Sequence, residues 1–206
     1  MRDFNHSAQM KFYVLMCFAM LSTACAKLTP SVNVCFSPGG DCISSITAEI
    51  ENAKTEILIQ AYSLSSKPIA DAVVMAKRAG VNVEILLDKS STVAQNNAVY
   101  FASLKGIPTY LDAQHAVADN NVIIIDKGTV ITGSFNFTKE ADSKNAENLL
   151  IIRSDSVAST YFDNWELHKS HAEQFKGPEQ PQAQQKPKSE KKKAVKKKKK
   201  NTSGTS

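Results

Sequence analysis

Apolar residues between positions 27 and 176 follow two different periods along the chain. Short β-rich runs alternate with segments in which apolar residues recur every three or four positions, as Ile43, Ile46 and Ile50 do. Runs of the first kind predict buried strands, and segments of the second kind predict amphipathic helices. We expect strands at 32–36, 56–62, 81–87, 108–111, 122–125, 129–132 and 147–152, and helices at 42–54, 68–79, 92–104 and 156–175. This alternation is typical of an α/β domain with a buried sheet.

The N-terminal end differs from this pattern. Residues 12–24 form an uncharged apolar run that follows a lysine and leads into small residues, which is typical of a secretory signal peptide. The run is shorter than the roughly 20 residues that a membrane-spanning helix needs. We therefore expect residues 1–26 to be a cleaved signal peptide, with Met10 as an alternative start, and the mature protein to be periplasmic or secreted. A lipoprotein with a lipidated Cys25 is the alternative.

Export changes the interpretation of the cysteines, because two of the four, Cys35 and Cys42, remain in the mature chain. They flank the segment Pro38-Gly39-Gly40, which favours a turn that brings the two sulfurs together. An oxidising compartment then predicts a disulfide between Cys35 and Cys42. Two buried free thiols are the alternative, whereas a metal site is disfavoured because no His or further Cys lies nearby.

Charge is divided unevenly along the chain. The 25 Lys and Arg against 20 Asp and Glu give a formal charge of +5, but ten lysines and only two acidic residues lie in 177–206. The preceding residues therefore carry a net negative charge, which excludes a uniformly basic globular domain of the kind that binds duplexes. Residues 177–206 hold almost no apolar side chain, so we expect a disordered tail. Its lysines would attract polyanions in a salt-dependent way, or the tail only aids solubility.

The segment that begins at His115 contains a motif with fixed spacing. Six residues separate Asp126 from Gly133-Ser134-Phe135-Asn136, and the apolar runs on either side of residues 126–128 predict a β-hairpin. In these residues the chain resembles the phospholipase D superfamily, whose signature is His-x-Lys, four residues, Asp, six residues and Gly-Ser-x-Asn. Turn chemistry alone would account for the Gly-Ser pair, but it does not require this spacing.

The resemblance extends over residues 32–175 in the order of the elements, and it is closest to small exported bacterial members that act as nonspecific endonucleases. It implies a single phospholipase D-like domain over 27–176, an α/β sandwich with a central mixed sheet flanked by helices. It also implies a homodimer that shares one active site, and a phosphodiester substrate in nucleic acid or phospholipid. No cofactor is expected.

Two positions of the motif depart from the family. Asp119 stands where the family has its nucleophilic His, which forms a phosphohistidine, and Asn121 stands where the family has a phosphate-binding Lys. A carboxylate brings negative charge toward an anionic diester, and it is a poor proton donor at neutral pH. An amide offers donors without a full positive charge, so stabilisation of the developing charge is weakened.

The other motif residues match the family. By resemblance, Gly133, Ser134 and Asn136 bind the substrate phosphate, while Asp126 and Glu147 join positions 119 and 121 as candidate catalytic residues. His115 is either a displaced base or, in the preferred interpretation, an ordinary loop histidine.

Other candidate groups are weaker. A metal held by oxygens of the acidic residues Asp119, Asp126 and Glu147 is a disfavoured alternative. Strand-end Asp88 either carries function or caps a helix. His168 and His171 are expected to be solvated, because the sequence shows no acid on their helix face.

These residues leave two hypotheses of different classes. In the first, the protein is a secreted phosphodiesterase, an endonuclease or a phospholipase D-like hydrolase. In the second, it is a catalytically impaired pseudoenzyme that binds nucleic acid or anionic lipid through the motif and the lysine tail.

Overall fold

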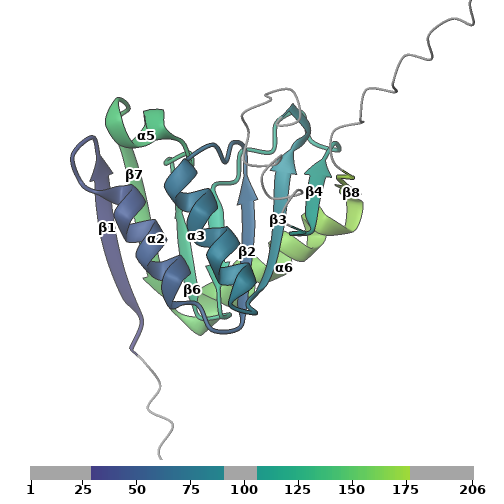
Figure 1. The fold of residues 1–206 in the computed structure, drawn as a ribbon, viewed down its shortest axis with the longest axis horizontal. Coiled ribbons are helices and arrows are strands. Elements are labelled where there is room, and N and C mark those ends of the chain that lie inside the picture. The colour runs from purple at the N-terminus through teal and green to yellow at the C-terminus, as the bar shows by residue number, and fades with distance from the viewer. Residues whose placement is uncertain (1–28, 91–105, 177–206) are drawn as a thin grey trace, which may run out of the picture.

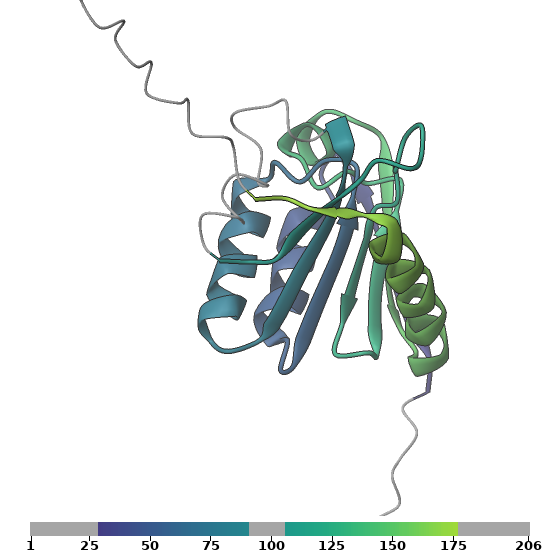
Figure 2. The same ribbon diagram turned by 90° about the vertical axis from the view of Figure 1, so that its right-hand side faces the viewer.

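The computed structural model describes residues 29–90 and 106–176, which form one mixed sheet with helices on both faces (Figures 1 and 2). The strands are β1 (Ser31–Ser37), β2 (Glu56–Ala61), β3 (Asn82–Asp88), β4 (Thr109–Asp112), β5 (Val122–Ile125), β6 (Thr129–Gly133), β7 (Glu147–Arg153) and β8 (Glu173–Gln174). The helices are α2 (Cys42–Asn52), α3 (Lys67–Arg78), α5 (Lys139–Ser143) and α6 (Asp155–His171).

The strand order explains the mixed sheet. Within the described residues the order is β1-β7-β6-β5-β2-β3-β4-β8. Neighbours β2, β3 and β4 are parallel, and the other neighbouring pairs are antiparallel. The predicted single-domain α/β sandwich with a central mixed sheet is therefore confirmed.

Both faces of the sheet are buried, and each has its own core. Ile57 and Ile59 of β2 face α2 and α3, whereas Leu58 between them lies in the core beneath α6. Because successive strand residues point to opposite faces, burial on both sides requires the continuous apolar run that the sequence shows. Trp165 of α6 is buried in the second core, and its indole N–H donates to the Ile59 carbonyl oxygen at 3.3 Å.

Several boundaries differ from the sequence prediction. The structure adds α5, where Thr138 accepts a hydrogen bond from the amide of Ala141 and so caps a single polar turn. It ends the last helix at His171, because the next residues pair with β4 as the short strand β8. The predicted helix 92–104, the signal peptide and the tail lie outside the described residues.

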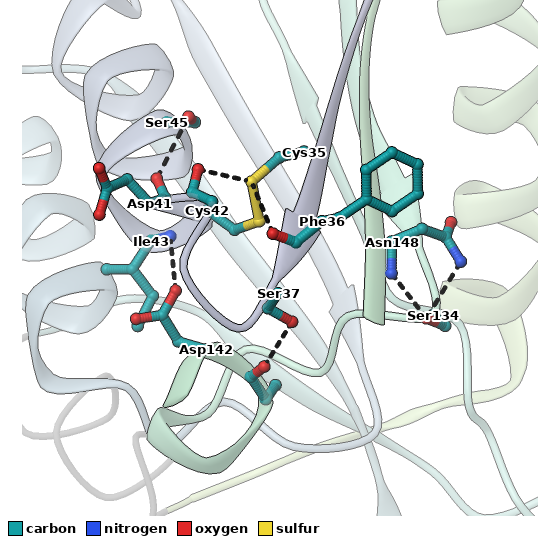
Figure 3. Close-up of a disulfide and its surroundings, with 12 residues drawn as sticks. Cys35, Phe36, Ser37, Asp41, Cys42, Ile43, Ser45, Ser134, Asp142 and Asn148 are labelled. Atoms are coloured by element: carbon teal, nitrogen blue, oxygen red, sulfur yellow. Dashed lines mark hydrogen bonds between the residues drawn. A yellow bond between two sulfur atoms is a disulfide. The ribbon is translucent and has the colours of Figure 1, made fainter. Parts of the chain in front are cut away.

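The predicted disulfide is present. Cys35, near the end of β1, is bonded to Cys42, the first residue of α2, with the two Cα atoms 5.7 Å apart (Figure 3). The turn between them is tight at Gly40, where an added Cβ would lie 2.1 Å from the carbonyl oxygen of Phe36. Only glycine fits there, so the Pro-Gly-Gly segment and the disulfide fix the start of α2 together.

The strand ends next to residues 119–121 and 133–136 of the motif lie at one edge of the sheet. Strands β1, β2, β3, β4 and β6 end at this edge, while β5 and β7 begin there. We call it the site edge, and it lies at the top of Figure 1. Among the described residues, no helix is long and apolar enough to cross a membrane.

Candidate active site

The β5–β6 hairpin and the start of β7 bring four motif positions to the site edge. Asn121 immediately precedes β5, and Gly133 and Ser134 stand at the end of β6. Val122 pairs with Thr132, and Gly133 pairs with Leu149, two residues after Glu147. Antiparallel pairing therefore places these four residues together although 26 positions separate the first from the last.

Gly133 is required by the local backbone. Its φ is +148°, and a Cβ added there would lie 2.2 Å from the carbonyl oxygen of Asn148 on the neighbouring strand. A side chain would push β6 and β7 apart at this point. The first letter of the Gly-Ser-x-Asn motif is thus explained by strand packing, and it leaves the backbone bare beside Ser134.

Ser134 is the centre of a hydrogen-bond network. Its hydroxyl donates to Glu147 Oε2 at 2.6 Å. Its oxygen accepts from the backbone and side-chain nitrogens of Asn148 at 3.1 and 3.2 Å (Figure 3). The other oxygen of Glu147 accepts from the Asn145 amide at 3.1 Å. These contacts hold an exposed serine and a carboxylate in one orientation at the rim of the sheet.

Asp119 and Asn121 contact each other at the place of the family's His and Lys. The Asn121 amide donates to an oxygen of the Asp119 carboxylate at 3.2 Å. Asp119 is exposed, whereas Asn121 is only 6% exposed, and its Oδ1 is buried without a hydrogen-bond partner in the described structure. The Oδ1 of Asn136 is in the same state. Two buried acceptors in the motif region therefore lack a donor, and a lysine at 121 would replace the first of them with an ammonium donor.

Asp126 does not join these residues. It lies at the opposite end of β5, where it and Lys127 adopt positive φ values of 51° and 55° in the hairpin turn. Its carboxylate accepts from the backbone N–H groups of Lys54, Thr55 and Glu56 at 2.7–3.0 Å, and also from the Thr55 hydroxyl. Its position gives Asp126 a structural role, in place of the catalytic one that the sequence suggested.

The hydrogen bonds of Asp126 also shift its acidity. Burial raises the pKa of this carboxyl, but the backbone donors of residues 54–56 and the Thr55 hydroxyl outweigh burial and hold the pKa below the usual 3.8. The anion is therefore the form that the fold favours.

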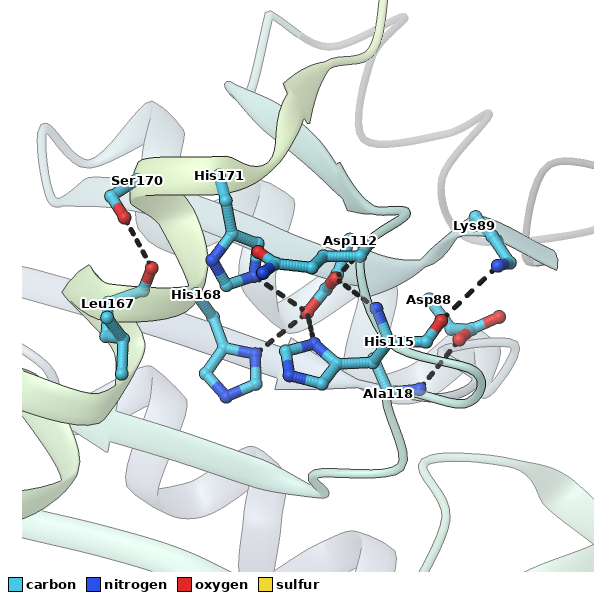
Figure 4. Close-up of polar contacts among 10 residues, drawn as sticks. Asp88, Lys89, Asp112, His115, Ala118, Leu167, His168, Ser170 and His171 are labelled. Carbon is cyan, nitrogen blue, oxygen red and sulfur yellow. Dashed lines mark hydrogen bonds and ion pairs between the residues drawn. The ribbon is translucent and has the colours of Figure 1, made fainter.

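The expectation that His168 and His171 are solvated was wrong. Both lie on the last turn of α6 and face Asp112 at the end of β4, an acid that comes from a distant part of the sequence (Figure 4). His115 faces the same carboxylate at 2.8 Å. A spacing of three places two histidines on one helix face, but the sequence did not reveal which strand packs against that face.

Asp88 anchors the segment that leads to the motif. This buried carboxylate accepts from the backbone and hydroxyl of Ser90 at 2.8 and 2.5 Å. It also accepts from the backbone N–H of Ala118 at 2.7 Å (Figure 4). Burial raises the pKa of Asp88, but the bonds from Ser90 and Ala118 together hold it below the usual value. The sequence marked Asp88 as a strand-end residue, and its bond to Ala118 fixes the chain one residue before Asp119.

The chain is similar to known proteins over most of the described residues. A family described as cardiolipin synthase, phospholipase D-like domain, matches residues 46–168. A phospholipase D of Rickettsia typhi is 40% identical over 140 residues, which are 68% of this chain and 69% of that protein. The mitochondrial cardiolipin hydrolase of Homo sapiens is 25% identical over 133 residues, which are 64% of this chain and 53% of that protein.

A solved structure has the same fold. The crystal structure of Nuc, a phospholipase D family member from Salmonella typhimurium, superposes with a TM-score of 0.70 at 34% sequence identity. The match covers 72% of this chain and 100% of Nuc. The likeness therefore extends over the whole of the Nuc chain.

Proposed function

This chain belongs to the phospholipase D superfamily, and from that premise we propose that it binds a phosphodiester at the site edge without hydrolysing it efficiently. The observation that carries the proposal is the contact between Asp119 and Asn121, which occupies the place of the nucleophilic imidazole and the ammonium. The binding half of the motif is present, whereas the half that makes and breaks bonds is changed.

Phosphate binding is supported by the groups at the end of β6. The exposed Ser134 hydroxyl and the side-chain amide of Asn148 lie within 3.2 Å of each other, beside the bare backbone of Gly133. Asn136 supplies a second amide at the same edge of the sheet. Neutral donors of this kind bind an anionic oxygen in any phosphodiester, whether it belongs to nucleic acid or to phospholipid.

Loss of the chemical step is supported by where the imidazoles lie. Within residues 29–90 and 106–176, all three histidines contact Asp112, and none contacts Ser134 or Glu147. An Asp119 carboxylate that attacked phosphorus would bring together two anions, and Asn121 carries no charge to neutralise them. Proton transfer by a positioned residue is typically worth 10²–10⁴ in rate, so we expect a loss of about that size.

Residual hydrolysis is the second candidate function, and one observation favours it. Both oxygens of Glu147 are held, one by Ser134 and the other by Asn145, as a positioned acid requires. The phospholipase D names of the relatives add to this possibility for the lineage as a whole. An assay has to separate the two candidates.

The test compares the unaltered full chain with the double variant Asp119→His, Asn121→Lys. Each is incubated with plasmid DNA, with phosphatidylcholine or cardiolipin vesicles, and with a small chromogenic phosphodiester. We expect no cleavage above background by the unaltered chain and cleavage at least about 100-fold faster by the double variant. Equal rates for the two proteins would show that the unaltered chain is an enzyme.

Binding needs its own control. Ser134→Ala should weaken binding of the small phosphodiester, because the hydroxyl at the centre of the network is removed, while circular dichroism reports an unchanged fold. If the unaltered chain and the Asp119→His, Asn121→Lys variant both bind the phosphodiester but neither cleaves any substrate, the assignment of the motif as a catalytic site is wrong.

We also propose that two chains form a homodimer through β1, which would bring their two site edges together. Val32, Val34 and Phe36 form an exposed apolar row on β1, with Phe36 on the opposite side of the strand from the disulfide (Figure 3). Phe36 pairs with Asn148, so the row ends beside the Ser134 network. An unpartnered apolar row on an edge strand is a surface that a second chain can cover.

The ends of the chain complete the proposal. A signal peptide over 1–26 would export the protein, and the lysine-rich segment 177–206 would hold it on polyanions. The phospholipase D-like domain over 27–176 would then meet its phosphodiester outside the cytoplasm. No cofactor is needed for binding of this kind.

A further inference from the structure

Three imidazoles converge on one buried carboxylate. His115 Nδ1 and His168 Nδ1 each lie 2.8 Å from Asp112 Oδ2, and His171 Nε2 lies 3.4 Å from the same oxygen (Figure 4). The Asp112 side chain is fully buried, whereas the His168 and His171 side chains are 12% and 22% exposed. His115 is 44% exposed and closes the cluster from the solvent side.

The backbone supplies these four groups as two pairs, each with a spacing of three. Asp112 ends β4, and His115 follows it in the next turn, while His168 and His171 share one face of the last turn of α6. The rings stand close together, with centroids 4.7 Å apart for His115 and His168 and about 5.3–5.4 Å apart for the other two pairs. Three separate parts of the fold therefore contribute to one small volume.

Hydrogen bonding alone accounts poorly for this arrangement. A carboxylate oxygen has two lone pairs, yet three ring nitrogens point at Oδ2. The other oxygen, Oδ1, accepts from the backbone N–H groups of Gln114 and His115 at 3.0 and 3.4 Å. Three ring nitrogens gathered around one carboxylate oxygen bring four possible metal-ligand atoms into one small volume.

We propose that Asp112, His115, His168 and His171 form a Zn²⁺ site. Their ligand atoms all lie within 4.8 Å of one another. Tetrahedral zinc with bonds of about 2.0–2.1 Å separates its ligand atoms by roughly 3.3 Å, so small shifts of the side chains would bring the four ligand atoms to this spacing. Three neutral imidazoles and one carboxylate are ligands that zinc accepts, and a set of four protein donors is typical of a structural site.

The helix geometry favours a cation at this place. α6 ends at His171, so the negative end of its dipole points toward the cluster. Lys169 on the same turn is directed elsewhere, because it pairs with Glu84. Lys89 donates to the His115 carbonyl oxygen at 3.3 Å and orders the backbone behind the cluster without occupying it.

The zinc site is separate from the motif residues. Strands β3 and β2 lie between β4 and β5, which puts the end of β4 about 14 Å from the start of β5 at the usual spacing between strands. Residues 113–121 cross this distance from Asp112 to the motif. Zinc would thus fasten β4, α6 and the beginning of this crossing segment, and it would do so whether or not the site edge hydrolyses a phosphodiester.

The test uses the full chain, prepared without a histidine tag, stripped with a chelator and titrated with ZnCl₂ by calorimetry. We expect one Zn²⁺ per chain, and a rise in Tm of about 5–10 °C at a free metal concentration 100-fold above Kd. Substitution of Co²⁺ should give the visible absorption of a tetrahedral site with nitrogen and oxygen ligands. The variant His168→Gln should weaken zinc binding by more than about 100-fold, because loss of a residue that only hydrogen-bonds a ligand typically costs about 10–100-fold.

Two further variants keep the outcome interpretable. His115→Gln changes the most exposed ligand, so it keeps the fold even where His168→Gln does not, and it should also weaken binding. Asp163→Asn, an exposed carboxylate on the same helix, should bind zinc as the unaltered chain does. Absence of stoichiometric binding, or equal affinity in the His115→Gln and unaltered chains, would overturn the proposal.

Discussion

Among the described residues, three aspartates each accept two or more backbone N–H bonds, and each thereby fixes a segment whose shape the sheet alone does not determine. Asp126 joins the hairpin turn to residues 54–56, Asp88 holds Ala118, and Asp112 accepts from Gln114 and His115. A carboxylate that accepts several N–H bonds is held in its charged form. At the scale of single residues, these three acidic side chains therefore have structural roles.

Asp126→Asn should destabilise the fold by about 1–3 kcal/mol at neutral pH, because a charged acceptor of four hydrogen bonds becomes a neutral one. The pKa of Asp126 is lower in the folded state than the usual 3.8, so its contribution is complete above that value and is lost as the pH falls below it. Urea unfolding should show a constant difference between the two proteins above about pH 5 and a shrinking one below 3.8.

The matched control is Asp163→Asn, at an exposed position of α6, which should leave the free energy of unfolding within about 0.5 kcal/mol of the original at every pH. A difference for Asp126→Asn that persists undiminished to pH 3 would contradict the role assigned to the anion.

Some residues of the site could be predicted and others could not, for a physical reason. Ser134 and Glu147 could be placed together because a hairpin and one antiparallel neighbour connect them through local pairing. The contact of Asp112 with His168 joins residues 56 positions apart through the packing of α6 on the sheet. The spacing of apolar residues along the sequence does not show which strand packs against which turn of a helix.

At the scale of elements, strands buried on both faces were the easiest to predict. Residues 57–59 of β2 and all four residues of β5 are apolar, because α2 and α3 cover one face and α6 covers the other. The short α5 and β8 escaped prediction, since one is a single polar turn and the other gains its two pairs only from β4. Elements of that length depend on tertiary contacts rather than on pattern.

The Cys35–Cys42 disulfide links β1 to α2, and its contribution to stability can be measured. The double variant Cys35→Ser, Cys42→Ser should lose about 2–3 kcal/mol of stability, the value expected for so short a loop. Urea unfolding at neutral pH measures the difference, and addition of a reductant should lower the stability of the unaltered chain only. An unchanged midpoint in the double variant would mean that the Pro-Gly-Gly turn alone fixes the start of α2.

At the scale of the whole molecule, the exposed row on β1 makes the proposed dimer testable. Val34 is 54% exposed, and Val34→Lys would place a charge in the centre of the interface. Sedimentation equilibrium should show a dimer for the unaltered chain and a shift toward monomer for this variant. Met75→Lys is the control, because Met75 is 58% exposed on α3 and lies away from β1. Sedimentation of the unaltered chain as a monomer would refute the proposed homodimer.

The lysine-rich end makes a separate prediction about retention. Deletion of residues 178–206 should weaken binding to DNA and to vesicles of anionic lipid, and it should reduce the dependence of binding on salt, because fewer counterions are released. Binding isotherms between about 50 and 200 mM salt measure both effects. If the binding constants of the two proteins depend equally on salt concentration, the lysines do not hold the protein on polyanions.

The anchors that flank the motif have a consequence for how this protein can change over evolutionary time. Asp88 and Asp112 fix the segment up to Ala118, and β5 fixes it again from Val122, so the fold depends little on the exposed side chain at 119. Substitutions at position 119 can therefore accumulate or revert, because they change the stability of the fold little and are not removed by selection for a stable protein. The chemistry of the site is free to be lost and regained on a scaffold that stays the same.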